Sequence, residues 1–312
     1  MRLATIDVGT NTALLLISEW QQGRLVEVTR SSGYVRLGEG LEASGRVSGA
    51  ALERLRGVLE AHMQLVRESG AADVVVTGTS ASRDAGNGHL LHDIVREITG
   101  TPYRILSGEE EAEVTFLGAV SGWTGAWPGI GIPTVVDVGG GSTEVVQGRA
   151  TDENVELGHR TSMDLGSVRI TERFFDRLPP KTLDVEAARM HVGEMVRKRL
   201  SLFDRPVHLV GASGTAQVLG SLHAEQTGRP GPGEDGIPRG DVDAWAHRLE
   251  GMSADEVMAL DPARMRGRAD VFAAGVMILR EVMEALDAPR LFISGYGVRH
   301  GVAIRYFREL TG

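Results

Sequence analysis

Two hydrophobic patterns alternate along the chain. Residues 3–8 form a short apolar run typical of a buried strand, whereas residues 48–69 repeat apolar positions at helical spacing. The same patterns predict further strands at 13–18, 25–29, 73–77, 102–106, 134–139, 143–147, 207–210 and 290–294, and further helices at 89–98, 109–120, 183–203, 241–249, 254–260, 268–286 and 301–310. Glycine- and proline-rich segments at 121–133 and 226–240 predict loops. Because strands alternate with helices, the sequence predicts an α/β fold.

One turn sequence occurs twice, about a domain length apart. Asp7-Val-Gly-Thr-Asn-Thr and Asp137-Val-Gly-Gly-Gly-Ser-Thr each end one predicted strand and begin another. A chain of 312 residues is long enough for two domains. The repeated turn therefore predicts a duplicated fold of two halves with a cleft between them, where ligands commonly bind.

The amino-acid composition excludes several classes of function. With 42% apolar and 24% charged residues the chain is globular, and its net charge of −9 argues against a nucleic-acid partner. Cysteine is absent, which excludes disulfides, thiolate metal sites and a cysteine nucleophile. There is no apolar run long enough for a membrane span and no signal-peptide pattern at the start, so we expect a cytoplasmic protein without a membrane partner. Because Lys181 and Lys198 are the only lysines, a phosphate clamp must use arginines and backbone N–H groups.

The segment 137–144 has the strongest chemical signature. Three consecutive glycines between β-branched strands cost conformational entropy, and they let backbone N–H groups turn inward around a phosphate. The predicted phosphate-binding residues of this loop are Gly139, Gly140, Gly141, Ser142 and Thr143. The hard oxygens of Asp137 suit Mg²⁺, and Glu144 adds a second acid. The alternative is a glycine-rich hairpin with solvated ends.

The earlier copy of the turn predicts a second clamp for phosphate or metal. In this prediction Asp7 binds the metal. The phosphate-binding residues of the turn are Thr10, Asn11 and Thr12. Asp and Asn are also ordinary turn formers, so a plain hairpin is the alternative.

Three other places could contribute polar groups. Gly211, Ser213 and Gly214 lie at a strand–glycine loop–helix junction, and Arg83 follows a buried strand, where sites of α/β proteins lie. Residues 109–111 are three glutamates that begin a helix; the helix dipole alone can explain them, and one turned inward could act as a general base. The P-loop, H-E-x-x-H and G-x-S-x-G motifs are absent.

Taken together, these stretches resemble the exopolyphosphatase and guanosine pentaphosphate phosphohydrolase family of the actin-like superfamily. The most specific pair is Ser-Gly-Glu-Glu-Glu-Ala at 107–112 and Asp-x-Gly-Gly-Gly-Ser-Thr-Glu at 137–144. Further matching pieces span nearly the whole chain in family order: 6–12, 77–84, 163–169, 211–215, 268–270 and 294–301.

The resemblance implies a fold and residue roles. The fold would be a duplicated, actin-like (ribonuclease H-like) one, with domains at 1–120 plus 297–312 and at 121–296. Glu111 would be the catalytic glutamate and Arg83 a phosphate-binding arginine in the catalytic set. Asp137 and Glu144 would lie around the metal and the attacking water, with Mg²⁺ or another divalent cation such as Mn²⁺ as the cofactor.

The function implied by the resemblance is release of terminal orthophosphate from inorganic polyphosphate, with guanosine pentaphosphate as the alternative substrate. An actin-like kinase or ATPase, and a regulator that binds polyphosphate or an alarmone without turnover, are further alternatives. A homodimer is an open alternative to a monomer. Longer family members carry an additional C-terminal helical region, so we expect this chain to prefer short polymers. Arg169, Arg173 and Arg177, spaced four apart, could instead line a polymer track on one helix face.

Overall fold

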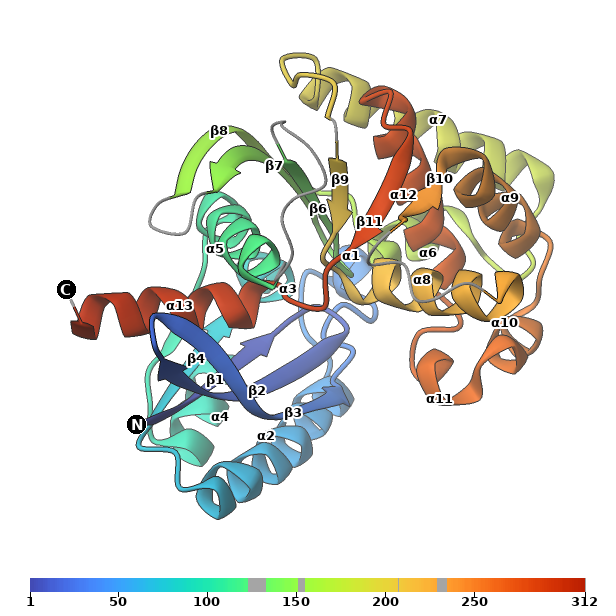
Figure 1. Cartoon of the computed structure of the whole chain (residues 1–312). Helices are drawn as coiled ribbons and strands as arrows, with labels where there is room; N and C mark the ends of the chain where they lie inside the picture. The colour runs from blue at the N-terminus through green and yellow to red at the C-terminus, as the bar shows by residue number, and fades with distance from the viewer. Residues whose placement is uncertain (123–132, 151–154, 207, 229–234, 312) are drawn as a thin grey trace. The chain divides into compact units, whose positions relative to one another are not determined.

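The computed structural model describes residues 1–122, 133–150, 155–206, 208–228 and 235–311. The chain divides into two compact units, here called the first unit (Met1–Gly118 with Tyr296–Gly312) and the second unit (Ala119–Gly295). The bounds expected from the sequence are 1–120 with 297–312, and 121–296. Figure 1 shows the chain coloured from its N-terminus to its C-terminus.

The first unit contains a five-stranded sheet in the order β3-β2-β1-β4-β5. The strands β1 (Arg2–Val8), β2 (Thr12–Gln21) and β3 (Arg24–Tyr34) form an antiparallel meander, and β4 (Asp73–Gly78) and β5 (Tyr103–Ile105) extend the sheet parallel to β1. The helices of this unit are α1 (Leu41–Ser44), α2 (Gly49–Ser69), α3 (Ser80–Asp84), α4 (His89–Thr99), α5 (Gly108–Ser121) and α13 (Val298–Thr311).

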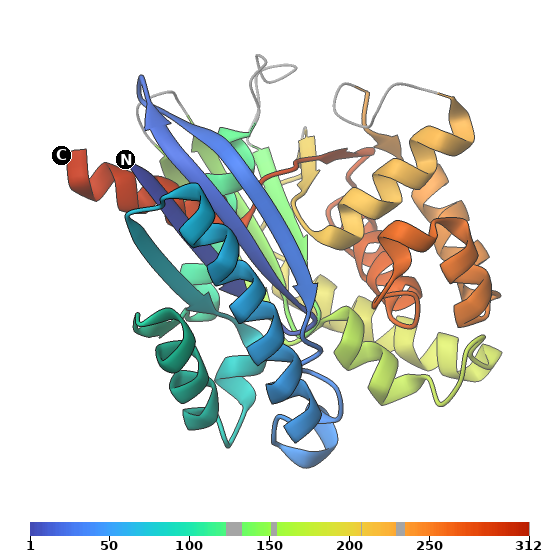
Figure 2. The same cartoon turned by 90° about the horizontal axis from the view of Figure 1, so that it is seen from below.

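Side-chain alternation along the strands places helices on both faces of this sheet. Ile6 and Leu15 pack in the core with α2 and α4, whereas Leu3 and Leu16 pack with Phe307 of α13. Figures 1 and 2 show α2 and α13 on opposite sides of the strands. Both faces of the central strands are therefore buried, which explains why their sequences read as continuous apolar runs.

The second unit contains a six-stranded sheet in the order β10-β11-β9-β6-β7-β8. Its strands are β6 (Pro133–Val138), β7 (Thr143–Ala150), β8 (Val155–Met163), β9 (His208–Gly211), β10 (Ile237–Pro238) and β11 (Arg290–Ile293). Its helices are α6 (Ser167–Phe174), α7 (Thr182–Arg199), α8 (Gly214–Thr227), α9 (Arg239–Glu250), α10 (Ala254–Leu260), α11 (Pro262–Met265) and α12 (Phe272–Ala285).

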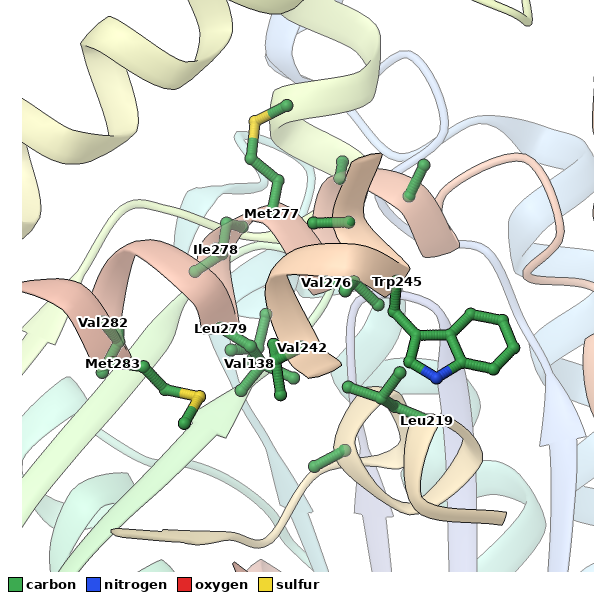
Figure 3. Close-up of a cluster of buried hydrophobic side chains, with 14 of the residues drawn as sticks. Val138, Leu219, Val242, Trp245, Val276, Met277, Ile278, Leu279, Val282 and Met283 are labelled. Carbon is green, nitrogen blue, oxygen red and sulfur yellow. The ribbon is translucent and has the colours of Figure 1, made fainter. Parts of the chain in front are cut away.

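Helix α12 lies at the centre of the core of the second unit. Its side chains are buried around almost the whole helix, which is typical of a helix enclosed by other elements. Figure 3 shows Val276 and Leu279 of α12 beside Trp245 of α9 and Leu219 of α8. This core supports the strands β6 and β9, whose ends carry the loops described below.

The two sheets share one topology. The order β3-β2-β1-β4-β5 of the first unit corresponds to β8-β7-β6-β9-β11 of the second, each being an antiparallel meander followed by two parallel strands. The predicted duplicated, actin-like (ribonuclease H-like) α/β fold is therefore confirmed.

Several predicted element bounds were wrong. The helix expected at 183–203 ends at Arg199, and the helix expected at 268–286 begins at Phe272 because the preceding residues form turns. Strand β8 and helix α3 were not predicted, and the helix expected to carry Arg169, Arg173 and Arg177 on one face is α6, which ends at Phe174. The expected loop 226–240 contains the end of α8, the short strand β10 and the start of α9. Most of the expected loop 121–133, residue 207 of an expected strand, and 229–234 lie outside the described residues.

Among the described residues, the helices are all too short or too polar to cross a membrane.

Candidate functional site

The parallel strands of the first unit bring three polar segments to one edge of its sheet. Val8 of β1 is opposite Gly78 of β4, which is opposite Ile105 of β5, so these strands end together. The segments that follow them are the turn 9–12, helix α3 with Arg83, and the start of α5 with Glu111. Parallel topology thus places three of the sequence-predicted sites at the same edge.

Backbone hydrogen bonds hold the turn 9–12. The N–H of Gly9 donates to the carbonyl of Thr12 at 2.9 Å, which closes the turn. The carbonyl of Asn11 accepts from the N–H groups of Val35 and Arg36, and the carbonyl of Thr10 accepts from Gly38. Asp7 and Thr10 are buried, at 8% and 6% exposure. The predicted phosphate ligands of this turn therefore have a fixed backbone.

Arg83 and Glu111 form an ion pair. The Nη1 of Arg83 donates to Glu111 Oε2 at 2.7 Å and to the carbonyl of Leu106 at 2.8 Å. Both bonds use one nitrogen of the guanidinium, and its other two nitrogens make no hydrogen bond within the described part of the chain. A partly exposed guanidinium held along one edge keeps the other edge for an anion such as phosphate.

The three glutamates of residues 109–111 have different surroundings. Ser107 and Glu110 form a capping box at the start of α5: the Ser107 N–H donates to Glu110 Oε2, and the Glu110 N–H donates to Ser107 Oγ. The Ser107 N–H and the nearby Arg104 lower the pKa of Glu110. Glu109 is exposed, whereas Glu111 is 6% exposed and faces Arg83. Glu111 is therefore the one of the three that lies beside the arginine.

A buried tyrosine, whose role the sequence patterns do not reveal, contacts the helix that carries Arg83. Tyr103 Oη forms a hydrogen bond of 2.6 Å with Oγ of Ser82, which belongs to α3. A side chain at Gly78 would collide with the Tyr103 hydroxyl, so a glycine is required there. This packing fixes the short helix that carries Arg83.

In the second unit, β6 and β9 are parallel neighbours, with Val136 opposite Gly211. The loop 139–142 follows β6 and the junction 212–214 follows β9, so the two segments meet at one edge of this sheet. Ser213 caps α8 by accepting from the Ala216 N–H at 3.1 Å. The Arg268 guanidinium, which sequence reasoning did not single out as a site residue, lies beside Gly214.

The glycine loop has an ordered arrangement of peptide groups. The carbonyls of Gly139 and Gly140 accept from the N–H groups of Ser167 and Val168 at the start of α6, and the carbonyl of Gly141 accepts from Arg169 Nε at 3.0 Å. In a planar trans peptide the following N–H points away from the carbonyl. The N–H groups of Gly140, Gly141 and Ser142 therefore point to the side opposite α6, as in an anion-binding nest.

Gly166 is necessary for this loop conformation. A Cβ atom at this position would collide with the Gly140 carbonyl and the Gly141 nitrogen, which are backbone atoms. Gly166 was part of a matched sequence segment, but its role depends on a contact that only the folded chain reveals. Thr143 adds a further bond, since its Oγ1 donates to the carbonyl of Leu165 at 2.6 Å.

Two acids face each other across strands β6 and β7. Asp137 is directly opposite Glu144, so the two side chains lie on the same face of the sheet. Burial raises the pKa of Asp137 to about 6. Glu144 is 1% exposed, and its Oε1 accepts from Ser162 Oγ at 2.7 Å. A buried carboxylate whose ionisation is disfavoured is stabilised by a cation.

The described residues contain no group of three or more His, Asp or Glu side chains arranged as a complete metal site. The pair Asp137 and Glu144 nevertheless fits a hard divalent cation, because Mg²⁺ is commonly held by one or two carboxylates with water and substrate oxygens as the other ligands. The Asp7 carboxylate belongs to the first unit and has the same donor chemistry.

Comparison with known proteins identifies relatives along the whole chain. A model of the Ppx/GppA phosphatase family matches residues 16–309. Exopolyphosphatase 2 of Mycobacterium tuberculosis is 34% identical over 325 residues, which cover 97% of this chain and 98% of that protein. The guanosine-5'-triphosphate,3'-diphosphate pyrophosphatase of Vibrio vulnificus is 29% identical, over 98% of this chain and 59% of its own length. The crystal structure of the Aquifex aeolicus Ppx/GppA family member has a TM-score of 0.76 at 25% identity, covering 100% of this chain and 99% of that one.

Proposed function

Because the chain belongs to the Ppx/GppA phosphatase family, we propose that it is an exopolyphosphatase that releases terminal orthophosphate from inorganic polyphosphate. The observation that carries the proposal is the glycine loop, in which the N–H groups of Gly140, Gly141 and Ser142 point to one side. Such a row of donors fits phosphate oxygens. A relative named exopolyphosphatase, 34% identical over nearly the full length of both proteins, supports the same activity.

Charge neutralisation is the first requirement of phosphoanhydride hydrolysis. The transition state is loose, with negative charge on the phosphoryl oxygens, so donors must be in place before the reaction. In the proposal the loop 139–143 and the junction 211–214 of the second unit bind phosphate oxygens, and the turn 10–12 of the first unit supplies further phosphate-binding groups. The unbonded edge of the Arg83 guanidinium adds a charged fork.

Positioning of water is the second requirement. In the proposal Glu111 accepts a proton from the attacking water while Arg83 holds its carboxylate in place through the 2.7 Å contact. Asp137 and Glu144 would hold Mg²⁺ or Mn²⁺, which neutralises charge on the phosphate oxygens when it is bound. Bond formation to phosphorus and departure of the shortened polymer complete the reaction.

The alternative substrate is guanosine pentaphosphate, and the relative from Vibrio vulnificus favours it. Both substrates end in a phosphoanhydride, so the same groups would act on either. The lower identity and the partial coverage of that relative make polyphosphate the first choice.

Phosphate release from polyphosphate of defined length and from guanosine pentaphosphate, measured in parallel with and without Mg²⁺, tests the proposal. We expect faster release from polyphosphate, abolished by a chelator and restored by Mg²⁺. No release from either substrate would contradict the proposed function, and full activity in excess chelator would remove the metal from it.

A further inference from the structure

Three polar side chains form a row across the sheet of the second unit. Asp137 of β6 is opposite Glu144 of β7, and Glu144 is opposite Ser162 of β8. These strands are antiparallel neighbours in the sheet (Figure 1). Directly opposite residues in antiparallel strands share a face, so the three side chains project to the same side.

The contact between Ser162 and Glu144 determines the orientation of the acid. Ser162 Oγ donates to Glu144 Oε1 at 2.7 Å, which is a short, charge-assisted geometry for a hydroxyl and a carboxylate. Glu144 is 1% exposed, so bulk water does not surround its carboxylate. A hydrogen bond to one oxygen fixes the plane of the group and therefore the direction of the other oxygen.

The duplicated first unit provides an internal comparison. There Asp7 is opposite Leu14, and Leu14 is opposite Ser32. The first unit thus has the aspartate and the serine at the corresponding positions, with a leucine in place of the glutamate. A serine on this strand has a carboxylate to hold only in the second unit, which makes Ser32 a matched control for Ser162.

We propose that Ser162 is a positioning residue, whose hydroxyl holds Glu144 in the orientation that lets it bind a divalent cation together with Asp137. The inference rests on the proposed function, since it starts from a metal bound by these two acids. Partners that orient metal-binding side chains typically contribute about 10- to 100-fold to metal affinity or activity.

The test measures metal binding as well as turnover. Mn²⁺ serves as the probe, because the electron paramagnetic resonance signal of the free ion reports binding without substrate. Three variants are compared with the wild type: Ser162→Ala, which removes the hydroxyl; Ser162→Thr, which keeps it on a β-branched side chain; and Ser32→Ala, the matched control.

We expect Ser162→Ala to weaken Mn²⁺ binding at least about 10-fold and to lower kcat by a similar factor at fixed, subsaturating Mg²⁺. Excess Mg²⁺ should recover much of the lost rate. Ser162→Thr should restore both properties, and Ser32→Ala should leave both unchanged. The melting temperatures should stay close together, which separates a positioning role from general damage to the sheet.

Two outcomes would overturn the inference in distinguishable ways. If wild-type protein binds Mn²⁺ and Ser162→Ala binds it equally well, Ser162 does not position a metal-binding acid and the proposed function is unaffected. If wild-type protein binds no Mn²⁺, the inference fails together with the metal part of the proposed function. Failure of Ser162→Thr to restore binding would also overturn the inference, because the hydroxyl would then not be the determining group.

Discussion

At the scale of single residues, Glu111 differs from its neighbours by its partner. Glu109 is exposed and Glu110 completes a capping box, so neither needs a catalytic explanation. Glu111 is buried and paired with Arg83 at 2.7 Å. Burying a charged carboxylate beside a partly exposed arginine costs desolvation free energy, and stability of the fold does not require such a pair. It fits the proposed role in activating water.

Replacement of Glu111 by glutamine tests that role. Glutamine keeps the size of the side chain and one hydrogen-bond acceptor for Arg83 but cannot take up the proton. We expect kcat to fall about 10²- to 10⁴-fold. Glu109→Gln is the matched control and should retain normal turnover, as measured by phosphate release. Near-normal turnover of Glu111→Gln would move the general base to another residue.

Arg83→Lys tests the forked geometry of the guanidinium. Lysine keeps the charge but cannot bond the Leu106 carbonyl, Glu111 and a phosphate with one rigid group. We expect KM to rise about ten-fold, since the loss of one charge-assisted hydrogen bond costs about 1.5 kcal/mol or more. Arg104→Lys, at the exposed pair with Glu110, is the control. Unchanged kcat and KM in Arg83→Lys would show that the forked guanidinium of Arg83 does not bind the substrate.

At the scale of elements, the glycine loop and helix α6 depend on each other. The loop carbonyls satisfy N–H groups at the start of α6, which has no side-chain cap. Helix starts leave N–H groups unpaired, so the loop provides the partners that a capping residue would otherwise supply. The same bonds direct the loop N–H groups to the opposite side.

Gly166→Ala should break this coupling. The new methyl group would meet the backbone of Gly140 and Gly141, which cannot rotate away as a side chain could. We expect a loss of about 1–3 kcal/mol in the free energy of unfolding together with a large loss of activity. Gly57→Ala in α2, where nothing lies within 4 Å of an added Cβ, should instead stabilise the protein by about 0.5–1 kcal/mol. Denaturant unfolding and phosphate release check both variants.

Burial of His62 on α2 is expected to make the free energy of unfolding sensitive to acid. Burial, with a smaller contribution from Arg299, lowers the pKa of His62 from 6.5 to about 4. The folded state therefore binds fewer protons than the unfolded state between these pH values, and stability is lost as the pH falls through this window. A shift of this size corresponds to roughly 3 kcal/mol when the pH reaches 4.

His62→Leu should remove this contribution. Between pH 7 and pH 4 the variant should lose roughly 3 kcal/mol less of its unfolding free energy than the wild type. Denaturant unfolding at a series of pH values measures the difference, and His89→Leu at an exposed position is the control. Parallel pH profiles for His62→Leu and wild type would show that His62 does not contribute.

At the scale of the whole molecule, net charge bears on substrate length. The chain has a net charge of −9 and two lysines, so we expect the distal phosphates of a long polymer to gain little electrostatic attraction. The prediction that Arg169, Arg173 and Arg177 lie on one helix face and could line a polymer track was wrong. Helix α6 ends at Phe174, before Arg177, and Arg169 donates to the glycine loop.

We therefore expect efficiency on short polyphosphate to equal or exceed that on long polyphosphate, with distributive hydrolysis. Repulsion of distal phosphates should be strongest at low salt, where screening extends beyond about 10 Å. Electrophoresis of a long polymer at half-completion is the measurement, and a smooth ladder of intermediates is the expected result. Intact polymer beside free phosphate would indicate processive hydrolysis instead.

The fold class and the duplication follow from local pattern and repetition. Hydrophobic periodicity marked most strands and helices, because an element must show its buried face in its own sequence. The repeated Asp-x-Gly turns identified two halves, and the topologies of the two sheets confirm them. Periodicity failed at α3, whose five residues are too few to establish a repeat.

The sequence by itself determined which segments have the chemistry for phosphate and metal, since glycine runs and acids at strand ends are visible in it. Only the tertiary structure decided which of three adjacent glutamates faces Arg83, which side of the glycine loop presents its N–H groups, and that Ser162 meets Glu144. The physical reason is that these relations depend on strand pairing, on the packing of α6, and on contacts between residues far apart in the chain. Neither composition nor spacing encodes the register in which such segments meet.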